Sequence, residues 1–151
     1  FQFEDETGPI YTHARSLPPT RCDGAMIRSS LIADGCEIGT GTVIENAVIG
    51  LRCRIGNNVT IKNAVIMGAD YFQSKEDCAA DEAAGIPPVG ISDGAVIDGA
   101  IVDKNCRIGR GAKLSPAGFT TAPEGSPVVI QDGIIILPKD ATLPPHWSLK
   151  H

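Results

Sequence analysis

The sequence predicts an all-β fold in which the chain winds as a parallel β-helix around a three-sided prism. The first observation is a row of isoleucines over residues 27–66, with successive spacings of 5, 6, 6, 5, 6, 6 and 5: Ile27, Ile32, Ile38, Ile44, Ile49, Ile55, Ile61 and Ile66. Neither a helical period nor strict alternation produces this spacing, whereas a chain that turns a corner about every six residues does. The spacings repeat every 17 residues, so residues 17 apart should lie in stacked strands.

The second observation is the character of the residues between the isoleucines. The column Arg28, Glu45, Lys62 and Asp98 follows stacked aliphatic residues and alternates in charge, as neighbouring strands of a sheet favour. We expect the residue four positions after each aliphatic to point inward, which gives an uncharged row: Leu31, Cys36, Thr42, Val48, Cys53, Val59 and Val65. Asn46 and Asn63 should stack at a corner, where asparagine tolerates the left-handed backbone of a sharp bend.

Composition excludes several classes of protein. The 151 residues fit one domain, and the net charge of −5 argues against nucleic acid or an anionic membrane as the main partner. An apolar run of about 20 residues, which a membrane span needs, is absent from the sequence. The five cysteines are odd in number and lack metal-type spacing, which disfavours a disulfide framework or a metal site. Cys36, Cys53 and Cys106 are interpreted as small inward-facing residues of the coils.

Residues 1–24 lack the repeat and do not begin with Met, so we interpret them as a linker segment that follows a missing N-terminal part of a longer protein. The β-helix domain is predicted over residues 25–151, with an insertion at about 71–90. Ser74 predicts the start of a short helix there and Gly85 its end. The pattern resumes in register at Ile91, and residues 115–127 are predicted to form a loop. The last coil should span residues 130–143, with Trp147 covering its open end.

The sequence offers few residues for catalysis. It contains no phosphate-binding glycine loop, metal-spaced cluster or nucleophile elbow, and His13, His146 and His151 all lie outside the coils. An alternative function for such a fold is that of a hexapeptide-repeat acyltransferase, which places its catalytic histidine between coils. None of the three histidines is expected there, so this alternative is disfavoured. Cations remain as candidates, because charge-assisted hydrogen bonds suit a phosphorylated ligand. Arg54 and Arg107 should share one outward row and, with Arg52, are candidate anion contacts.

Several stretches, in order along the chain, resemble the C-terminal domain of ADP-glucose pyrophosphorylases, also called glucose-1-phosphate adenylyltransferases. They are residues 9–12, Arg15, and residues 17–19, 48–52, 67–71, 101–105, 107–109 and 139–141. The resemblance implies a left-handed parallel β-helix of the hexapeptide-repeat type that follows a nucleotidyltransferase domain. It also implies a cytoplasmic enzyme, or a plastid enzyme in a plant.

In that family the whole enzyme converts ATP and glucose 1-phosphate to ADP-glucose and pyrophosphate with Mg²⁺, on the route to glycogen or starch. The resemblance places the catalytic residues in the preceding domain and none here. It implies that this domain joins subunits into a homotetramer and binds anionic allosteric effectors. By motif, the effector-binding residues are Lys104, Lys139 and Arg15. A purely structural β-helix remains as a third interpretation.

Overall fold

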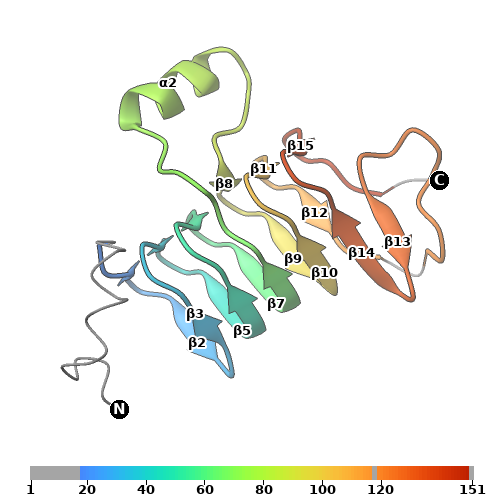
Figure 1. The fold of residues 1–151 in the computed structure, drawn as a ribbon, viewed down its shortest axis with the longest axis horizontal. Coiled ribbons are helices and arrows are strands. Elements are labelled where there is room, and N and C mark those ends of the chain that lie inside the picture. Colours follow the sequence, from blue (N-terminus) through green and yellow to red (C-terminus); the bar gives the residue numbers. More distant parts are fainter. Residues whose placement is uncertain (1–17, 117–118, 150–151) are drawn as a thin grey trace.

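Stacked coils of short strands build the protein, with one helix standing to the side (Figure 1). The computed structural model describes residues 18–116 and 119–149. The strands are β1 (Arg21–Cys22), β2 (Met26–Arg28), β3 (Leu31–Ile32), β4 (Glu37–Ile38), β5 (Val43–Ile49), β6 (Arg54–Ile55), β7 (Thr60–Ile66), β8 (Gly90–Ile91), β9 (Val96–Asp98), β10 (Ala100–Val102), β11 (Arg107–Ile108), β12 (Lys113–Leu114), β13 (Val129–Gln131), β14 (Ile134–Leu137) and β15 (Thr142–Leu143), and the helix is α2 (Lys75–Ala83).

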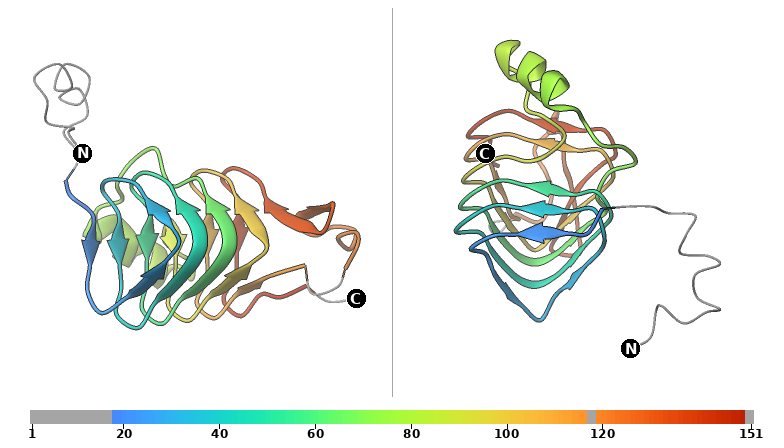
Figure 2. Two further views of the ribbon diagram at one scale, coloured as in Figure 1. Left: turned by 90° about the horizontal axis from the view of Figure 1, so that it is seen from below. Right: turned by 90° about the vertical axis from the view of Figure 1, so that its left-hand side faces the viewer.

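The strands pair in the register that the 17-residue repeat predicts. Residues of successive coils stack in three columns: Ile27, Ile44, Ile61, Ile97 and Leu114; Ile32, Ile49, Ile66, Val102 and Leu137; Ile38, Ile55, Ile91, Ile108 and Leu143. Every pairing in these columns is parallel, and most of the aliphatic side chains are buried in one continuous core. Figure 2 shows the coils following one another along a single axis. The parallel β-helix is therefore confirmed, including the resumption of its register after the insertion.

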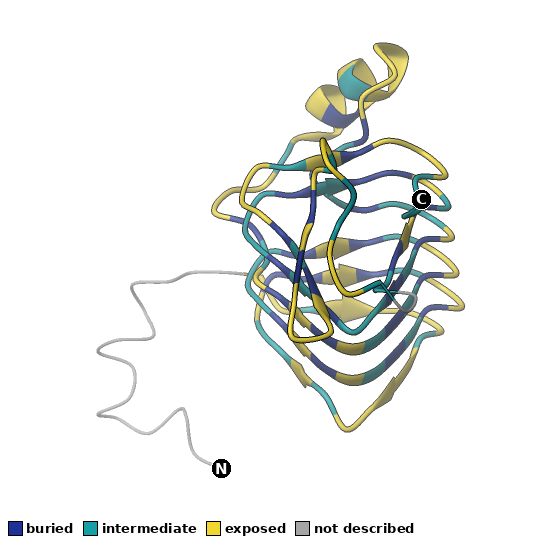
Figure 3. Cartoon of the chain, turned by 90° about the vertical axis from the view of Figure 1, so that its right-hand side faces the viewer, coloured by how far each residue is buried: buried dark blue, intermediate teal, exposed yellow. Residues whose placement is uncertain are grey.

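The inward row predicted from the sequence is partly wrong. Cys36, Thr42, Cys53 and Val59 are buried as expected, but Leu31, Val48 and Val65 are 71%, 43% and 37% exposed. One side of the prism has five residues instead of six, and along it the inward position is held by Ala47, Ala64 and Ala100. The rule that holds is that the residue two before each corner aliphatic points inward, because side chains alternate along a strand. Buried and exposed positions alternate accordingly along the strands of the inner coils, such as β5 and β7 (Figure 3).

The stacked corners form as predicted. Asn46 and Asn63 both have positive φ, 51° and 50°, and the Nδ2 of Asn46 donates to the Oδ1 of Asn63 at 2.8 Å. The charged column is also confirmed, because Arg28 pairs with Glu45, Glu45 with Lys62 and Lys62 with Asp98 as Cα partners. Each coil therefore positions the next through the same residue types.

The insertion between β7 and β8 contains α2, which projects from one face of the coil stack (Figure 2). Ser74 caps the helix, with its Oγ accepting from the Asp77 N–H at 3.0 Å, and Gly85 follows the helix with φ of 78°. Both boundary signals in the sequence are confirmed. None of the described residues forms a helix that is long and apolar enough to cross a membrane.

The C-terminal coil differs from the simple coil expected. β13 and β14 pair antiparallel, joined by Asp132 and Gly133 with φ of 53° and 78°, which is the backbone of a tight hairpin turn. Trp147 packs against the core, and its carbonyl accepts from the Lys113 N–H at 2.7 Å. At the other end, β1 lies within the segment interpreted as a linker and pairs with β4.

Candidate functional site

Lys104 and Lys139 lie beside each other on one edge of the prism. Each follows a residue of the same stacked column by two positions, Val102 and Leu137, which are Cα partners in β10 and β14. The turns that carry them also bond, because the Asp140 N–H donates to the Lys104 carbonyl at 3.0 Å. The repeat therefore brings together two lysines 35 positions apart, and both side chains remain about half exposed.

The carboxylate of Asp70 faces both lysines. Its Oδ1 is 3.1 Å from the Lys104 Nζ and its Oδ2 is 3.9 Å from the Lys139 Nζ. Asn105 orients it, since the Asn105 Nδ2 donates to the Asp70 Oδ2 at 3.1 Å and its Oδ1 accepts from the Asp70 N–H at 2.9 Å. The hydrogen bond from Lys104, followed by that from Asn105, lowers the pKa of Asp70 below its ordinary value. We call Lys104, Lys139 and Asp70 the lysine cluster.

Arg52 occupies the same edge of the prism, in an earlier coil. Its Nη1 donates to the Ala69 carbonyl at 3.2 Å, and its guanidinium carbon is 5.9 Å from the centre of the Phe72 ring. Both contacts hold the start of the insertion against the coils. Arg52 therefore attaches the insertion to the coils near the lysine cluster. Its role as an anion contact stays a prediction.

Arg54 and Arg107 do share one outward row, with Gly90 between them. The insertion covers this row. The Arg107 Nη1 donates to the Asp81 Oδ2 at 2.6 Å and to the Pro87 carbonyl at 2.9 Å, and the Arg54 Nη1 is 2.8 Å from the Cys78 Sγ. The bond from Arg107, followed by that from Gln73, lowers the pKa of Asp81. The two arginines therefore fasten α2 to the coils.

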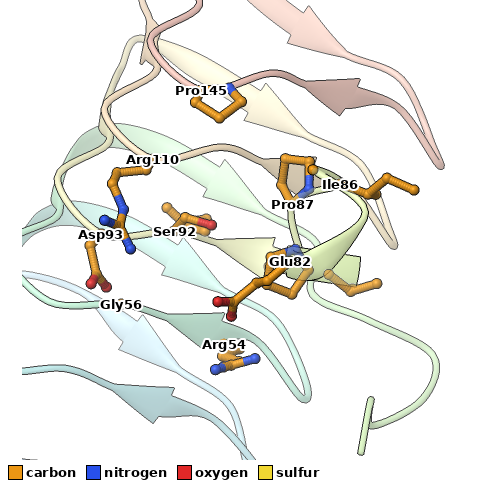
Figure 4. A pocket seen from close by; sticks show the side chains of 14 residues that line it. Arg54, Gly56, Glu82, Ile86, Pro87, Ser92, Asp93, Arg110 and Pro145 are labelled. Carbon is orange, nitrogen blue, oxygen red and sulfur yellow. The ribbon is translucent and has the colours of Figure 1, made fainter. Parts of the chain in front are cut away.

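A cleft of about 320 Å³ opens between the returning part of the insertion and the coils. Figure 4 shows Arg54 and Glu82 on one side of it, and Arg110 and Asp93 on the other. The Asp93 Oδ1 already accepts from the Asn57 N–H at 2.8 Å. Since two carboxylates offset the two guanidinium groups, the cleft favours a purely anionic ligand less than the lysine cluster does.

Arg15, His13 and His151 lie outside the described residues. His146 is exposed in the turn after β15, with φ of 61°. Lys113 belongs to a different face from Lys104, because it lies in β12 of the second sheet while Lys104 lies at a corner. Among the described residues, no group of three or more His, Cys, Asp or Glu side chains could hold a metal ion.

Sequence reasoning missed Asp70, which joins the two lysines. Asp70 belongs to the run of residues 67–71 that opens the insertion, and this run could have drawn attention to it. Its pairing could not be read from the repeat, because Asp70 leaves the regular coil and only the stacking of later coils brings Lys104 and Lys139 to it.

The chain is similar to solved structures and matches one family model. A solved structure of a proposed acetyltransferase from Bacillus cereus has 16% sequence identity and a TM-score of 0.43, over 85% of this chain and 69% of that one. The family model of the GLGC left-handed parallel beta-helix domain matches residues 15–147. That match spans the coils, the insertion and the lysine cluster. It also shows that the β-helix is left-handed. The chain therefore belongs to the GLGC left-handed parallel beta-helix domain family.

Proposed function

We propose that this domain binds anionic allosteric effectors and supports subunit assembly in a glucose-1-phosphate adenylyltransferase. Family membership and the geometry of the lysine cluster support the proposal. The reaction itself, which joins glucose 1-phosphate to ATP with Mg²⁺ and releases pyrophosphate, would take place in a nucleotidyltransferase domain of the same polypeptide. The product, ADP-glucose, would serve glycogen or starch synthesis in the cytoplasm, or in a plastid.

The observation that carries effector binding is the position of the Asp70 carboxylate. The two oxygens of one carboxylate lie 3.1 Å and 3.9 Å from the two ammonium groups, so an anionic group of a ligand can bridge both lysines in the same way. Phosphate oxygens form stronger charge-assisted hydrogen bonds than neutral acceptors do. Asp103 and Asp140 neighbour the lysines in sequence, so further cations from outside the described residues, Arg15 among them, would strengthen the site.

Assembly is supported by an apolar row on the outside of the coils. Leu31, Val48 and Val65 stack in register, and all three are exposed. Ile101 and Ile134 continue the lining of the shallow depression along this row. Exposed apolar side chains that adjoin one another are typical of interaction sites. We propose that the adjoining nucleotidyltransferase domain or a neighbouring subunit of a homotetramer covers them.

Charge reversal in the full-length enzyme tests effector binding. Lys104→Glu and Lys139→Glu should each raise the concentration of an activating sugar phosphate or phosphoglycerate at half-maximal activation by about tenfold or more, because each removes a charged hydrogen bond. Basal turnover should change much less, since an effector site acts through coupling between sites. Activity measured against effector concentration checks both.

Lys113→Glu is the matched control, because it reverses an exposed lysine in the same coil but on another face. It should leave the activation curve unchanged. If both cluster variants kept the wild-type response, a purely structural β-helix would be the better interpretation. A collapse of basal turnover with an intact effector response would also contradict the proposal.

A further inference from the structure

The lysine cluster contains its own anion. Asp70 presents one oxygen to each lysine, and Asn105 holds the carboxylate in that orientation through two hydrogen bonds, one to Oδ2 and one from the backbone N–H. A ligand anion that bridges the two ammonium groups competes with this carboxylate for them. Binding is therefore an exchange of one anion for another, and not the filling of an open site.

Asp70 also stands where the coil passes into the insertion. Two residues on, Phe72 lies against Arg52, and Gln73 then bonds to both arms of the insertion. The Gln73 Oε1 accepts from the Val89 N–H at 2.9 Å, and its Nε2 donates to Asp81, which Arg107 holds. A short chain of contacts thus links the position of Asp70 to the attachment of α2.

We propose that Asp70 is an internal counter-ion that occupies the anion site until a phosphate dianion displaces it. This inference rests on the proposed function, because it assigns the same two lysines to the effector. A carboxylate ligand would replace Asp70 like for like, whereas a phosphate monoester brings nearly two charges and three acceptor oxygens. Asp70 therefore selects phosphorylated ligands over simple carboxylates, and its release frees the start of the insertion.

Asp70→Asn in the full-length chain tests the inference. The amide keeps an oxygen for Asn105 and removes the competing charge, so inorganic phosphate should bind about two- to fivefold more tightly, as expected for an exposed ion pair. The affinity for formate should rise by a larger factor than the affinity for phosphate, so the preference for phosphate becomes smaller. Both are measured by isothermal titration at pH 8 and fixed ionic strength. The binding event counted is the one that the Lys104→Glu, Lys139→Glu double variant abolishes.

Asp98→Asn is the control, since it removes one negative charge at a different corner. It should leave phosphate affinity unchanged, and equal tightening in this control would mean that net charge alone acts, which overturns the inference. If phosphate binding depends on the lysines but Asp70→Asn leaves it unchanged or weaker, the inference fails while the proposed site stands. If neither wild type nor Asp70→Asn shows a lysine-dependent event, both fail. Binding seen only in Asp70→Asn would support the inference.

Discussion

At the scale of single residues, Thr42 shows how the narrow interior treats a polar group. It is fully buried, and its hydroxyl donates to the Gly56 carbonyl at 2.7 Å and accepts from the Val59 N–H at 3.2 Å. Both partners belong to the next coil, so the hydroxyl replaces a strand hydrogen bond at the corner. The sequence marks position 42 only as uncharged and small, and these partners become visible only in the stacked coils.

Thr42→Val should therefore destabilise the domain by about 1–3 kcal/mol, because it keeps the shape but leaves the buried Val59 N–H and the partly buried Gly56 carbonyl without their partner. Urea denaturation followed by circular dichroism measures the change. Thr60→Val is the control, since Thr60 is a half-buried strand residue of β7, and its change should stay within about 0.5 kcal/mol. Equal effects at the two positions would show that the buried hydroxyl contributes nothing.

At the scale of elements, the five-residue side of the prism decides which residues face the core. Ile49 is 1% exposed and stacks between Ile32 and Ile66, whereas its neighbour Val48 is 43% exposed. Ile49→Asp buries an unpaired carboxylate at a cost of several kcal/mol, comparable with the whole stability of a small domain, and should unfold it. Val48→Asp should leave a folded domain with a normal thermal transition.

Circular dichroism on the two variants checks this prediction, which separates the inward rule found in the structure from the one expected from the sequence. Under the sequence-based rule, both positions point inward and both variants would unfold. A folded Ile49→Asp would contradict the stacked core itself.

The attachment of the insertion is also an element-scale property, and it depends on pH. The pKa of Asp81 is lowered first by Arg107 and then by Gln73. The folded state therefore favours the ionised carboxylate. The stabilisation that the ionised Asp81 gives to the attached insertion is complete above the ordinary aspartate pKa of about 3.9. It is lost as the pH falls through the lower pKa of the folded state.

Asp81→Asn should loosen α2 at neutral pH, so that a protease cleaves the turn at residues 84–88 about two- to fivefold faster than in wild type. Hydrogen exchange of α2 amides, compared between variant and wild type, extends the test to acid. The difference should stay constant down to about pH 5 and be lost as the pH falls through the lowered pKa of Asp81. A difference that grew in acid would contradict the assigned ion pair. Lys113→Ala, which removes a cation on another face, should not change cleavage.

At the scale of the whole molecule, the thiols report whether the coils stay closed. Cys22 is exposed, and the other four cysteines are buried. Burial raises the pKa of Cys106 to about 11 and raises those of Cys36 and Cys53 as well, so these thiols are poor nucleophiles near neutral pH. We expect one thiol to react quickly with a chromogenic disulfide at pH 8, and all five to react in denaturant.

Cys22→Ser should remove the fast phase and leave the slow reaction unchanged. A fast reaction of Cys36, Cys53 or Cys106, which lie in the coils, would mean that the coils open locally without global unfolding. Since the strands of each coil pair only with those of the neighbouring coils, the slow rate measures the opening of the stack.

Much of the fold was predictable because the coils of a solenoid have the same geometry, and this produces a repeat in the sequence. The spacing of Ile27, Ile44 and Ile61 predicted their stacking, and Ser74 and Gly85 predicted the ends of α2. The inward row failed at Leu31, Val48 and Val65, because a side of five residues shifts the alternation. The hairpin at Asp132 and Gly133 was also missed, since its aliphatic run is compatible with more than one register.

By itself, the sequence determined the parallel β-helix, its 17-residue coil and the exit of an insertion at one corner, since these follow from the order of aliphatic and small residues along the chain. Only the tertiary structure decided what the cations do. Arg54 and Arg107 hold the insertion, while Lys104 and Lys139 share Asp70. The physical reason is that an ion pair depends on distances between coils, and Asp70 reaches the two lysines only after later turns of the chain have stacked beside it.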